Sequence, residues 1–194
     1  MRVLILYANP IETSFGGALH KQVLEALRPS AHEIDDCDLY LEHFDPILSK
    51  QDRAEYDDMA RNRLRMAPYA DRLLAAEGLV LIYPVWTEGF PAILKGFFDR
   101  VFIPGVSFKL NPDGSTTPSL ENLKKIAAVC TYGADRLSTL LLGDPPRRVV
   151  KRLVRAMPGH PVSCEYFAQY DMNHSTSQRR SAFLARVKQA FEAW

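Results

Sequence analysis

Cysteine is scarce in this sequence, and the spacing that would suit a disulfide or metal framework is missing. Only three cysteines occur among 194 residues, and no two of them are spaced as CxxC. An odd number without such spacing argues against both frameworks and is typical of a reducing compartment. No apolar run approaches the length of a membrane-spanning helix, and the N-terminal run closes at Pro10. We therefore expect a cytoplasmic protein without a membrane span or a secretion signal.

The sequence also lacks the signatures of several enzyme and binding classes. Its five histidines show no HExxH or other ligand spacing, so we expect no catalytic metal. There is no GxSxG segment of a serine hydrolase, no GxGxxG segment of a dinucleotide fold and no Walker loop. Lys and Arg total 24 and Asp and Glu total 23, which leaves a formal net charge of +1. That balance argues against a nucleic-acid partner.

What is present is a regular alternation of strand and helix patterns. Short runs rich in apolar residues predict strands at 3–8, 33–40, 78–83, 125–131 and 162–170. Apolar residues at helical spacing predict helices at 15–27, 91–103, 149–157 and 183–191, and one or two more at 50–76 around Pro68. Prolines and glycines predict a long exposed loop at 104–122. The order implies one α/β domain over 1–194, with a doubly wound parallel sheet of five strands and helices on both faces.

The loop after the first predicted strand has the features of a phosphate site. In an open parallel sheet, ligands bind beyond the carboxyl ends of the strands. Thr13 and Ser14 can cap the helix that follows, and the first backbone N–H groups of a helix lack internal partners. Hydroxyls beside free amides at the positive end of a helix dipole suit a phosphate. The alternative is an ordinary helix cap with Phe15 in the core.

Two further loops at the same predicted edge differ from simple connectors. The segment 84–91 holds two prolines, one glycine and the flat side chains of Trp86 and Phe90, on which a planar ring could stack. The alternative is a rigid connector whose aromatics pack inward. The segment 130–136 contains Gly133, which permits close backbone approach, and Arg136, which could meet an anion. Its alternative is a simple turn.

In these loops the sequence resembles the NAD(P)H:quinone oxidoreductase family of flavodoxin-like proteins, including bacterial relatives that modulate drug activity or accompany potassium-efflux systems. The most specific match is PVWTEGFPAILKGFFDRVF at 84–102. The first loop matches with Asn9 where the family usually has histidine, and CTYG at 130–133 stands where relatives carry Thr-Thr-Gly-Gly. Residues 170–174, with Arg180 and Leu184, resemble the stretch that relatives use around the adenine half of FAD.

The resemblance implies a flavodoxin-like sheet of order 2-1-3-4-5 and a set of flavin-binding residues. These are Asn9, Thr13, Ser14, Phe15 and Gly16 at the phosphates, Pro84, Val85, Trp86 and Thr87 along the ring, Thr131, Tyr132 and Gly133 at its pyrimidine edge, and His174 and Arg180 at the adenine. Relatives often place aromatics where Thr87 and Glu88 stand, so we expect the stacking role to shift to Trp86. We expect catalytic roles for Trp86 and Tyr132, and Arg136 is our own candidate for stabilising charge on the reduced ring.

The resemblance further implies transfer of two electrons from NADH or NADPH to a quinone or similar aromatic acceptor. One slot that serves both substrates in turn implies ping-pong kinetics, and FAD is the expected cofactor, with FMN as the alternative. Relatives of this kind form homodimers with the site at the subunit interface. The other functions left open are an FMN azoreductase or nitroreductase, a flavin-binding redox subunit that regulates a transporter, and a flavin-free adaptor. An electron-carrier flavodoxin is disfavoured because such carriers usually have a strongly acidic surface.

Overall fold

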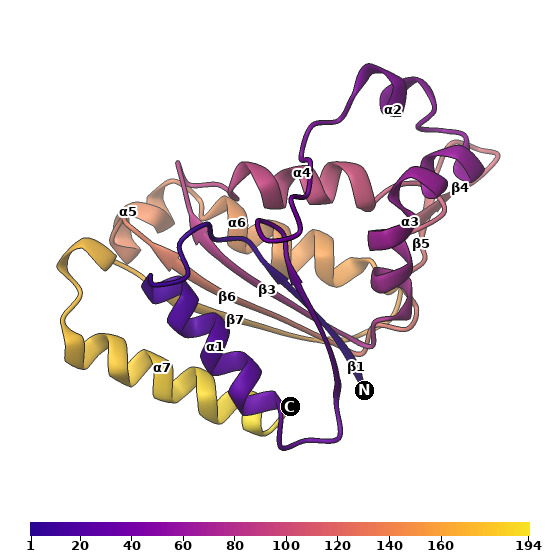
Figure 1. The fold of residues 1–194 in the computed structure, drawn as a ribbon. Helices are drawn as coiled ribbons and strands as arrows, with labels where there is room; N and C mark the ends of the chain where they lie inside the picture. The colour runs from indigo at the N-terminus through magenta and orange to yellow at the C-terminus, as the bar shows by residue number, and fades with distance from the viewer.

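A computed structural model describes residues 1–194, and its centre is a sheet of five parallel strands (Figure 1). The strands are β1 (Arg2–Tyr7), β2 (Glu33–Asp38), β3 (Gly78–Val85), β6 (Lys125–Tyr132) and β7 (Ser163–Gln169). Neighbouring strands pair in the order β2-β1-β3-β6-β7, and all four pairings are parallel. Counted along the chain, this is the order 2-1-3-4-5 that the sequence predicted, which is therefore confirmed.

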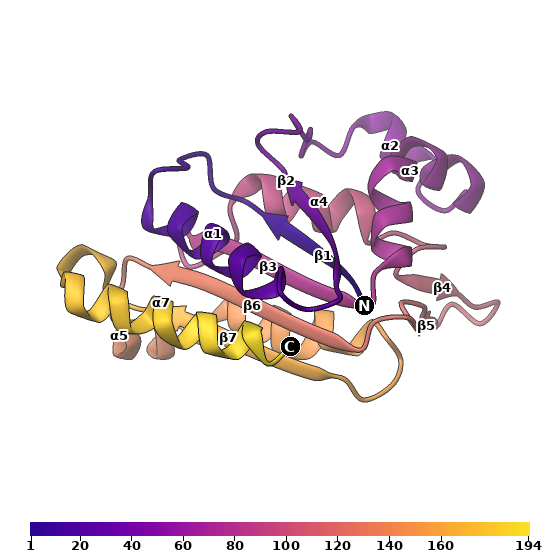
Figure 2. The ribbon, with the colours of Figure 1, turned by 60° about the horizontal axis from the view of Figure 1, so that its bottom comes forward.

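Helices cover both faces of the sheet (Figures 1 and 2). On one face lie α1 (Phe15–Leu27) and α7 (Ser177–Glu192), which pack side by side. On the other face and around its edges lie α2 (Lys50–Ala54), α3 (Met59–Ala75), α4 (Ala92–Val101), α5 (Arg136–Leu141), α6 (Pro145–Arg148) and the π-helix η1 (Val149–Val154). A short 3-10 turn, η2 (Met172–His174), precedes α7. No helix of the chain combines the length and the apolar character that a membrane crossing requires.

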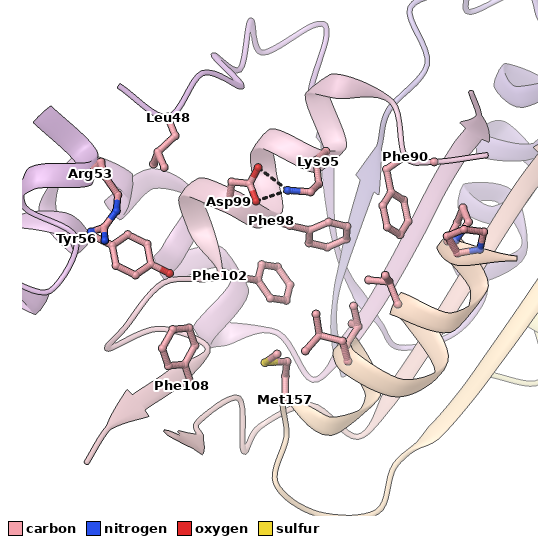
Figure 3. Close-up of a pocket in the computed structure, with 16 residues that line it drawn as sticks. Leu48, Arg53, Tyr56, Phe90, Lys95, Phe98, Asp99, Phe102, Phe108 and Met157 are labelled. Carbon is pink, nitrogen blue, oxygen red and sulfur yellow. Dashed lines mark hydrogen bonds and ion pairs between the residues drawn. The ribbon is translucent and has the colours of Figure 1, made fainter. Parts of the chain in front are cut away.

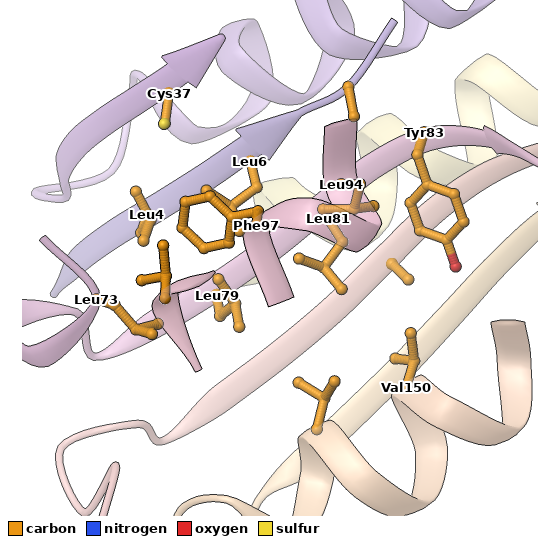
Figure 4. Packing of buried hydrophobic residues seen from close by; sticks show 14 of the residues in the cluster. Leu4, Leu6, Cys37, Leu73, Leu79, Leu81, Tyr83, Leu94, Phe97 and Val150 are labelled. Atoms are coloured by element: carbon orange, nitrogen blue, oxygen red, sulfur yellow. The ribbon is translucent and has the colours of Figure 1, made fainter. Parts of the chain in front are cut away.

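The central strands read as continuous apolar runs because both of their faces are buried. Successive side chains of a strand point to opposite faces. In β1, Ile5 packs toward α1 and α7, whereas Leu4 and Leu6 pack toward α3 and α4. Figure 4 shows the second of these layers, in which Leu4 and Leu6 lie beside Phe97 of α4. The edge strand β2 is mainly polar, and of its six residues only Cys37 is buried.

The structure confirms helices in the segment 50–76, where it places two, and shows where they begin and end. Pro68 lies inside α3 and does not interrupt it, because Ala70 and Leu73 pack into the core and hold the helix together beyond the proline. The break in the segment 50–76 falls between α2 and α3, where Asp58 caps α3 by accepting a hydrogen bond from the Arg61 amide. The predicted helix at 149–157 is the π-helix that continues α6.

The segment 104–122 was predicted to be an exposed loop, and this was wrong in part. It contains a small antiparallel hairpin of β4 (Phe108–Leu110) and β5 (Thr116–Pro118). Gly114 adopts a φ of 82° in the connecting turn, a conformation that suits glycine. The glycine and proline pattern marked the turn correctly, but composition did not show that the short segments on either side of it pair as strands.

Candidate functional site

The three loops singled out in the sequence emerge at one edge of the sheet. β1, β3 and β6 are adjacent and parallel, so their carboxyl ends lie together (Figure 1). The first loop leads into α1, the second into α4 and the third into α5. The switch in strand order lies at this edge, which is where open α/β sheets bind ligands.

The first loop is braced by its own side chains. Ser14 caps α1, and its hydroxyl accepts a hydrogen bond from the Gly17 amide at 3.2 Å. Asn9 is buried; its side-chain amide donates to Ser14 Oγ at 3.1 Å, and its Oδ1 accepts from the Ile11 amide at 3.0 Å. Asn9 therefore shapes the loop, and the cap interaction that formed the alternative interpretation is present.

The same loop offers hydrogen-bond donors that the protein leaves without acceptors. The backbone N–H groups of Phe15 and Gly16, at the start of a 13-residue helix, donate to no group of the chain. The hydroxyl of Tyr7, beside Ser14, is buried without a hydrogen-bond partner. Burial raises the pKa of Tyr7 to about 12, so this hydroxyl remains protonated at neutral pH. Free amides at the positive end of a helix fit the phosphate of a nucleotide.

The remaining predicted residues of the first loop differ in orientation. Thr13 is exposed. The ring of Phe15 is half-buried against Phe183 of α7, with ring centroids 6.3 Å apart. A side chain added at Gly16 would collide with the side-chain amide of Asn9. Phe15 and Gly16 therefore offer a ligand their backbone amides alone.

The second loop is a tight and strained turn. The Trp86 amide donates to the Gly89 carbonyl at 3.1 Å, and the Gly89 amide donates to the Trp86 carbonyl at 2.9 Å. Between them, Thr87 and Glu88 have φ values of 49° and 53°. Two positive φ angles in a two-residue turn normally call for asparagine and glycine, and a β-branched residue there is an outlier. Such strain is often retained at functional sites.

Side chains of the second loop point in opposite directions. Trp86 is 46% exposed and offers a flat apolar surface at the edge of the sheet. Phe90 packs inward between Tyr83 and Phe98, at 5.1 Å from each ring centroid. One carboxylate oxygen of Glu88 is buried without a hydrogen-bond partner. Of the two flat side chains that the sequence suggested, Trp86 is exposed to solvent, and Phe90 lines the apolar pocket described below.

The third loop requires a correction. The side chain of Tyr132 is fully buried, and its hydroxyl donates to Asp144 Oδ1 at 2.7 Å. A catalytic contact between this side chain and a flavin does not fit that orientation, although the backbone of 131–133 lies at the loop edge. A Cβ added at Gly133 would make only an ordinary van der Waals contact, so crowding does not require a glycine at this position. Arg136 is exposed, begins α5 and forms no ion pair.

His174 and Arg180 are occupied by local interactions. His174 is exposed and contacts the Asp171 carboxylate at 2.7 Å. Arg180 donates to the Ser175 carbonyl at 2.6 Å and so stabilises the turn before α7. The adjacent pocket, of about 520 Å³, is lined by other charged residues: Arg136, Arg179, Arg186, Asp135 and Asp171. His174 and Arg180 do not line it.

A large apolar pocket of about 800 Å³ begins at the second loop (Figure 3). Gly89 and Phe90 form its near end, and Phe102, Phe108 and Met157 line its far part. Pro145, Pro146, Val149 and Leu153 of α6 and η1 form the opposite wall. Sequence reasoning missed this wall as part of a site, because an apolar stripe on a helix looks the same whether it faces a core or a pocket. No group of three or more His, Cys, Asp or Glu side chains is arranged to hold a metal ion.

A family model described as "Flavodoxin-like fold" matches residues 1–190, and the chain belongs to this family. The chain is 28% identical over 155 residues to NAD(P)H dehydrogenase [quinone] 1 of Rattus norvegicus, a match that covers 72% of this chain and 56% of that enzyme. It is 27% identical over 150 residues to the uncharacterized NAD(P)H oxidoreductase YcaK of Escherichia coli K12, covering 73% and 69% of the two chains. The resemblance seen in the sequence is thus confirmed, although this chain spans little more than half the length of the rat relative.

Two further relatives bear on fold and cofactor. The crystal structure of Smu.1420 from Streptococcus mutans UA159 is 27% identical, has a TM-score of 0.89 and covers 100% of both chains. A protein of Lachnoclostridium phytofermentans named FMN-dependent NADH:quinone oxidoreductase is 30% identical over 125 residues, covering 63% of this chain and 61% of its own length.

Proposed function

We propose that this chain is a flavin-dependent NAD(P)H oxidoreductase that passes two electrons from NADH or NADPH to a quinone or a similar aromatic acceptor. The observation that carries the proposal is the meeting of three loops at one sheet edge, where free amides at the start of α1 lie at the same edge as the exposed ring of Trp86. The names of the NAD(P)H oxidoreductases to which the chain is similar support the same activity.

The residues at this edge of the sheet fit a flavin. The proposed reaction requires no side-chain nucleophile. Ser14 and the amides of Phe15 and Gly16 would hold its phosphate, and the segments 84–87 and 131–133 would line its ring. When bound, the flavin supplies the redox chemistry, by accepting a hydride and passing on two electrons. The protein contributes alignment, which by itself can remove several kcal/mol of barrier. The apolar pocket at Gly89 and Phe90 would admit donor and acceptor in turn, which predicts ping-pong kinetics.

We propose FMN rather than FAD as the bound form. The expectation of FAD rested on His174 and Arg180, and both side chains are engaged in the turn before α7. The relative from Lachnoclostridium is named FMN-dependent. The charged pocket beside α7, of about 520 Å³, lies next to the turn that holds His174 and Arg180. If the purified protein contained FAD, we would expect the adenylate half to occupy this pocket.

An absorbance spectrum of the purified protein, followed by chromatography of the released cofactor, tests the proposal. We expect a flavin spectrum, turnover with NADH or NADPH and a simple quinone, and parallel initial-rate lines. Intersecting lines would contradict the shared slot. Slow turnover with quinones, nitro and azo compounds alike would favour a regulatory subunit, and colourless protein that stays colourless with added flavin would favour the adaptor.

Arg136 is proposed to stabilise negative charge on the reduced ring. It is exposed, lies at the end of the third loop and has no carboxylate partner. We expect Arg136→Ala to slow flavin reduction by NADH about tenfold, which is less than the roughly 10²- to 10³-fold loss on removing one preorganised donor, because Arg136 is exposed to water. Arg152→Ala, at another exposed arginine without an ion pair, is the matched control. Equal reduction rates and equal flavin affinities in the two variants would show that Arg136 does not stabilise the reduced flavin.

We further propose a homodimer in which a second copy covers the outer part of the apolar pocket. The wall of this pocket includes Leu153, which is 54% exposed in the single chain. We expect the protein to sediment as a dimer and Leu153→Glu to shift it toward the monomer with reduced turnover. Leu64→Glu, at an exposed leucine of α3 outside the pocket, should leave the dimer intact. A monomeric wild-type protein would refute this arrangement.

We propose a single domain and a reducing compartment from the packing of the core and the state of the cysteines. Both apolar clusters share the strands of one sheet, which supports a single domain over 1–194. All three cysteines are free thiols, and Cys37 and Cys130 are buried. A reducing compartment such as the cytoplasm suits them.

A further inference from the structure

A chain of buried hydroxyl groups ends on one carboxylate behind the second and third loops. The Tyr83 and Tyr166 hydroxyl oxygens lie 3.2 Å apart, and those of Tyr166 and Tyr132 lie 2.6 Å apart. Tyr132 donates to Asp144 Oδ1 at 2.7 Å, and Tyr170 donates to Asp144 Oδ2 at 3.3 Å. The chain joins β3, β6 and β7 to the start of α6.

The hydrogen bonds of this chain have a single consistent direction. Because the proton of Tyr132 is donated to Asp144, the Tyr132 oxygen must accept from Tyr166, and the Tyr166 oxygen from Tyr83. Burial raises the pKa of all three tyrosine hydroxyls, so they remain neutral donors. Any negative charge of the network therefore lies on Asp144.

The charge of Asp144 is only partly compensated by a neighbouring cation. The residue is 8% exposed, and its φ of 45° shows that the fold holds it in the left-handed region. Arg147 lies one turn later, with its guanidinium over the Tyr166 ring at 5.2 Å, and it interacts electrostatically with Asp144 and with the Tyr170 hydroxyl, but the residue is exposed to solvent. Water and salt screen an exposed charge far more than a buried one. The carboxylate is thus satisfied mainly by two neutral hydroxyls.

The network adjoins, along the chain, the loops that would form the proposed flavin site. Tyr132 immediately precedes Gly133 of the third loop, and Tyr83 immediately precedes Pro84 of the second. Pro145, the residue after Asp144, lines the same pocket as Gly89 and Phe90. A change at Asp144 can therefore act on the ring site both through these loops and through its electric field.

We propose that Asp144 is a positioning residue that holds the third loop through Tyr132 and whose buried negative charge disfavours the reduced, more negative form of the flavin. This bias favours transfer of the electrons from the reduced flavin to the acceptor over their retention on the flavin. The inference rests on the proposed function and deepens it. It assigns to residues of α6 and the tyrosine chain a role that no motif of the sequence indicates.

The test compares binding of oxidised and reduced flavin to the apo-protein. Asp144→Asn removes the charge and suits the left-handed φ, which asparagine tolerates. We expect the ratio of affinities to shift toward reduced flavin by about 5-fold to 100-fold, the usual range of coupling between two sites. The midpoint potential should become more positive, and reoxidation by a quinone should slow. Asp144→Gly removes the same charge without backbone strain and should give the same shift if the asparagine variant folds poorly.

Two control variants separate charge from structure. Tyr166→Phe interrupts the hydroxyl chain but keeps the carboxylate, so it should lower the stability to unfolding and leave the affinity ratio unchanged. Asp113→Asn neutralises an exposed carboxylate in the β4–β5 turn and should leave the affinity ratio unchanged. Folded Asp144 variants with the wild-type ratio would overturn the inference. A wild-type protein that binds no flavin would instead overturn the proposed function.

Discussion

Replacing Gly17 with alanine is expected to abolish flavin binding and to destabilise the protein by about 3 kcal/mol. Helix propensity alone predicts the opposite sign, because alanine in a helix interior is more favourable than glycine by about 1 kcal/mol. Steric overlap decides the outcome. A Cβ at Gly17 would overlap the carbonyl oxygen of Glu12 and lie 2.7 Å from its carbonyl carbon. Both atoms are backbone, so the whole first loop would have to move.

That movement would also remove the proposed phosphate site. The Gly17 amide is the group that Ser14 caps, and the free amides of Phe15 and Gly16 depend on the same turn. Denaturant unfolding and fluorescence titration of the apo-protein with FMN measure the two effects. Gly133→Ala has ordinary space for its Cβ and should change the free energy of unfolding by less than about 0.5 kcal/mol. Wild-type stability and flavin affinity in Gly17→Ala would show that the loop is not held against α1 as described.

Replacing Thr87 and Glu88 together by asparagine and glycine is expected to stabilise the protein by about 2 to 4 kcal/mol and to lower its turnover. Each residue now occupies the left-handed region, which costs an ordinary side chain roughly 1–2 kcal/mol. Asn-Gly is the preferred pair for a two-residue turn of this kind. The same change removes the buried, unpartnered carboxylate oxygen of Glu88. Thermal and denaturant unfolding measure the gain, and steady-state kinetics with NADH and a quinone measure the loss.

A matched control exists outside the site. His43 also has a positive φ, 52°, but lies in the exposed segment after β2. His43→Gly should therefore stabilise the protein by about 1 kcal/mol without changing turnover. If the double variant gained no stability, the turn would not be strained. If it gained stability at unchanged turnover, the strain would have no functional role.

Much of the fold could be predicted from the sequence, because the apolar patterns that distinguish strands from helices are local. The continuous apolar runs of β1, β3 and β6 could only belong to strands covered on both faces, and the helical stripes between them required parallel connections. The segment 84–102 then identified the second loop through its family resemblance. The prediction of an exposed loop at 104–122 was wrong in part, because prolines and glycines mark the turn but do not show that the residues on either side of it pair as β4 and β5.

The site itself was predictable only at the level of loops. Parallel strands carry their carboxyl ends to one edge, so the meeting of the first, second and third loops follows from strand order alone. The direction of each side chain does not follow from strand order, because it depends on how the elements on the two faces of the sheet pack. Tyr132 was expected at the ligand, but its side chain points into the protein toward Asp144. His174 and Arg180 were expected at an adenine, but they stabilise a turn.

Apolar periodicity and loop composition by themselves determined the layers of this protein and the edge at which its chemistry should lie, since burial on both faces leaves a parallel strand few alternatives. The tertiary structure alone decided which polar groups are satisfied. Tyr132 and Asp144 are 12 residues apart, and Tyr83 and Tyr166 are 83 apart. The order of β3, β6 and β7 in the sheet brings these hydroxyls within hydrogen-bond distance of one another, and the position of α6 beside the sheet adds the carboxylate of Asp144.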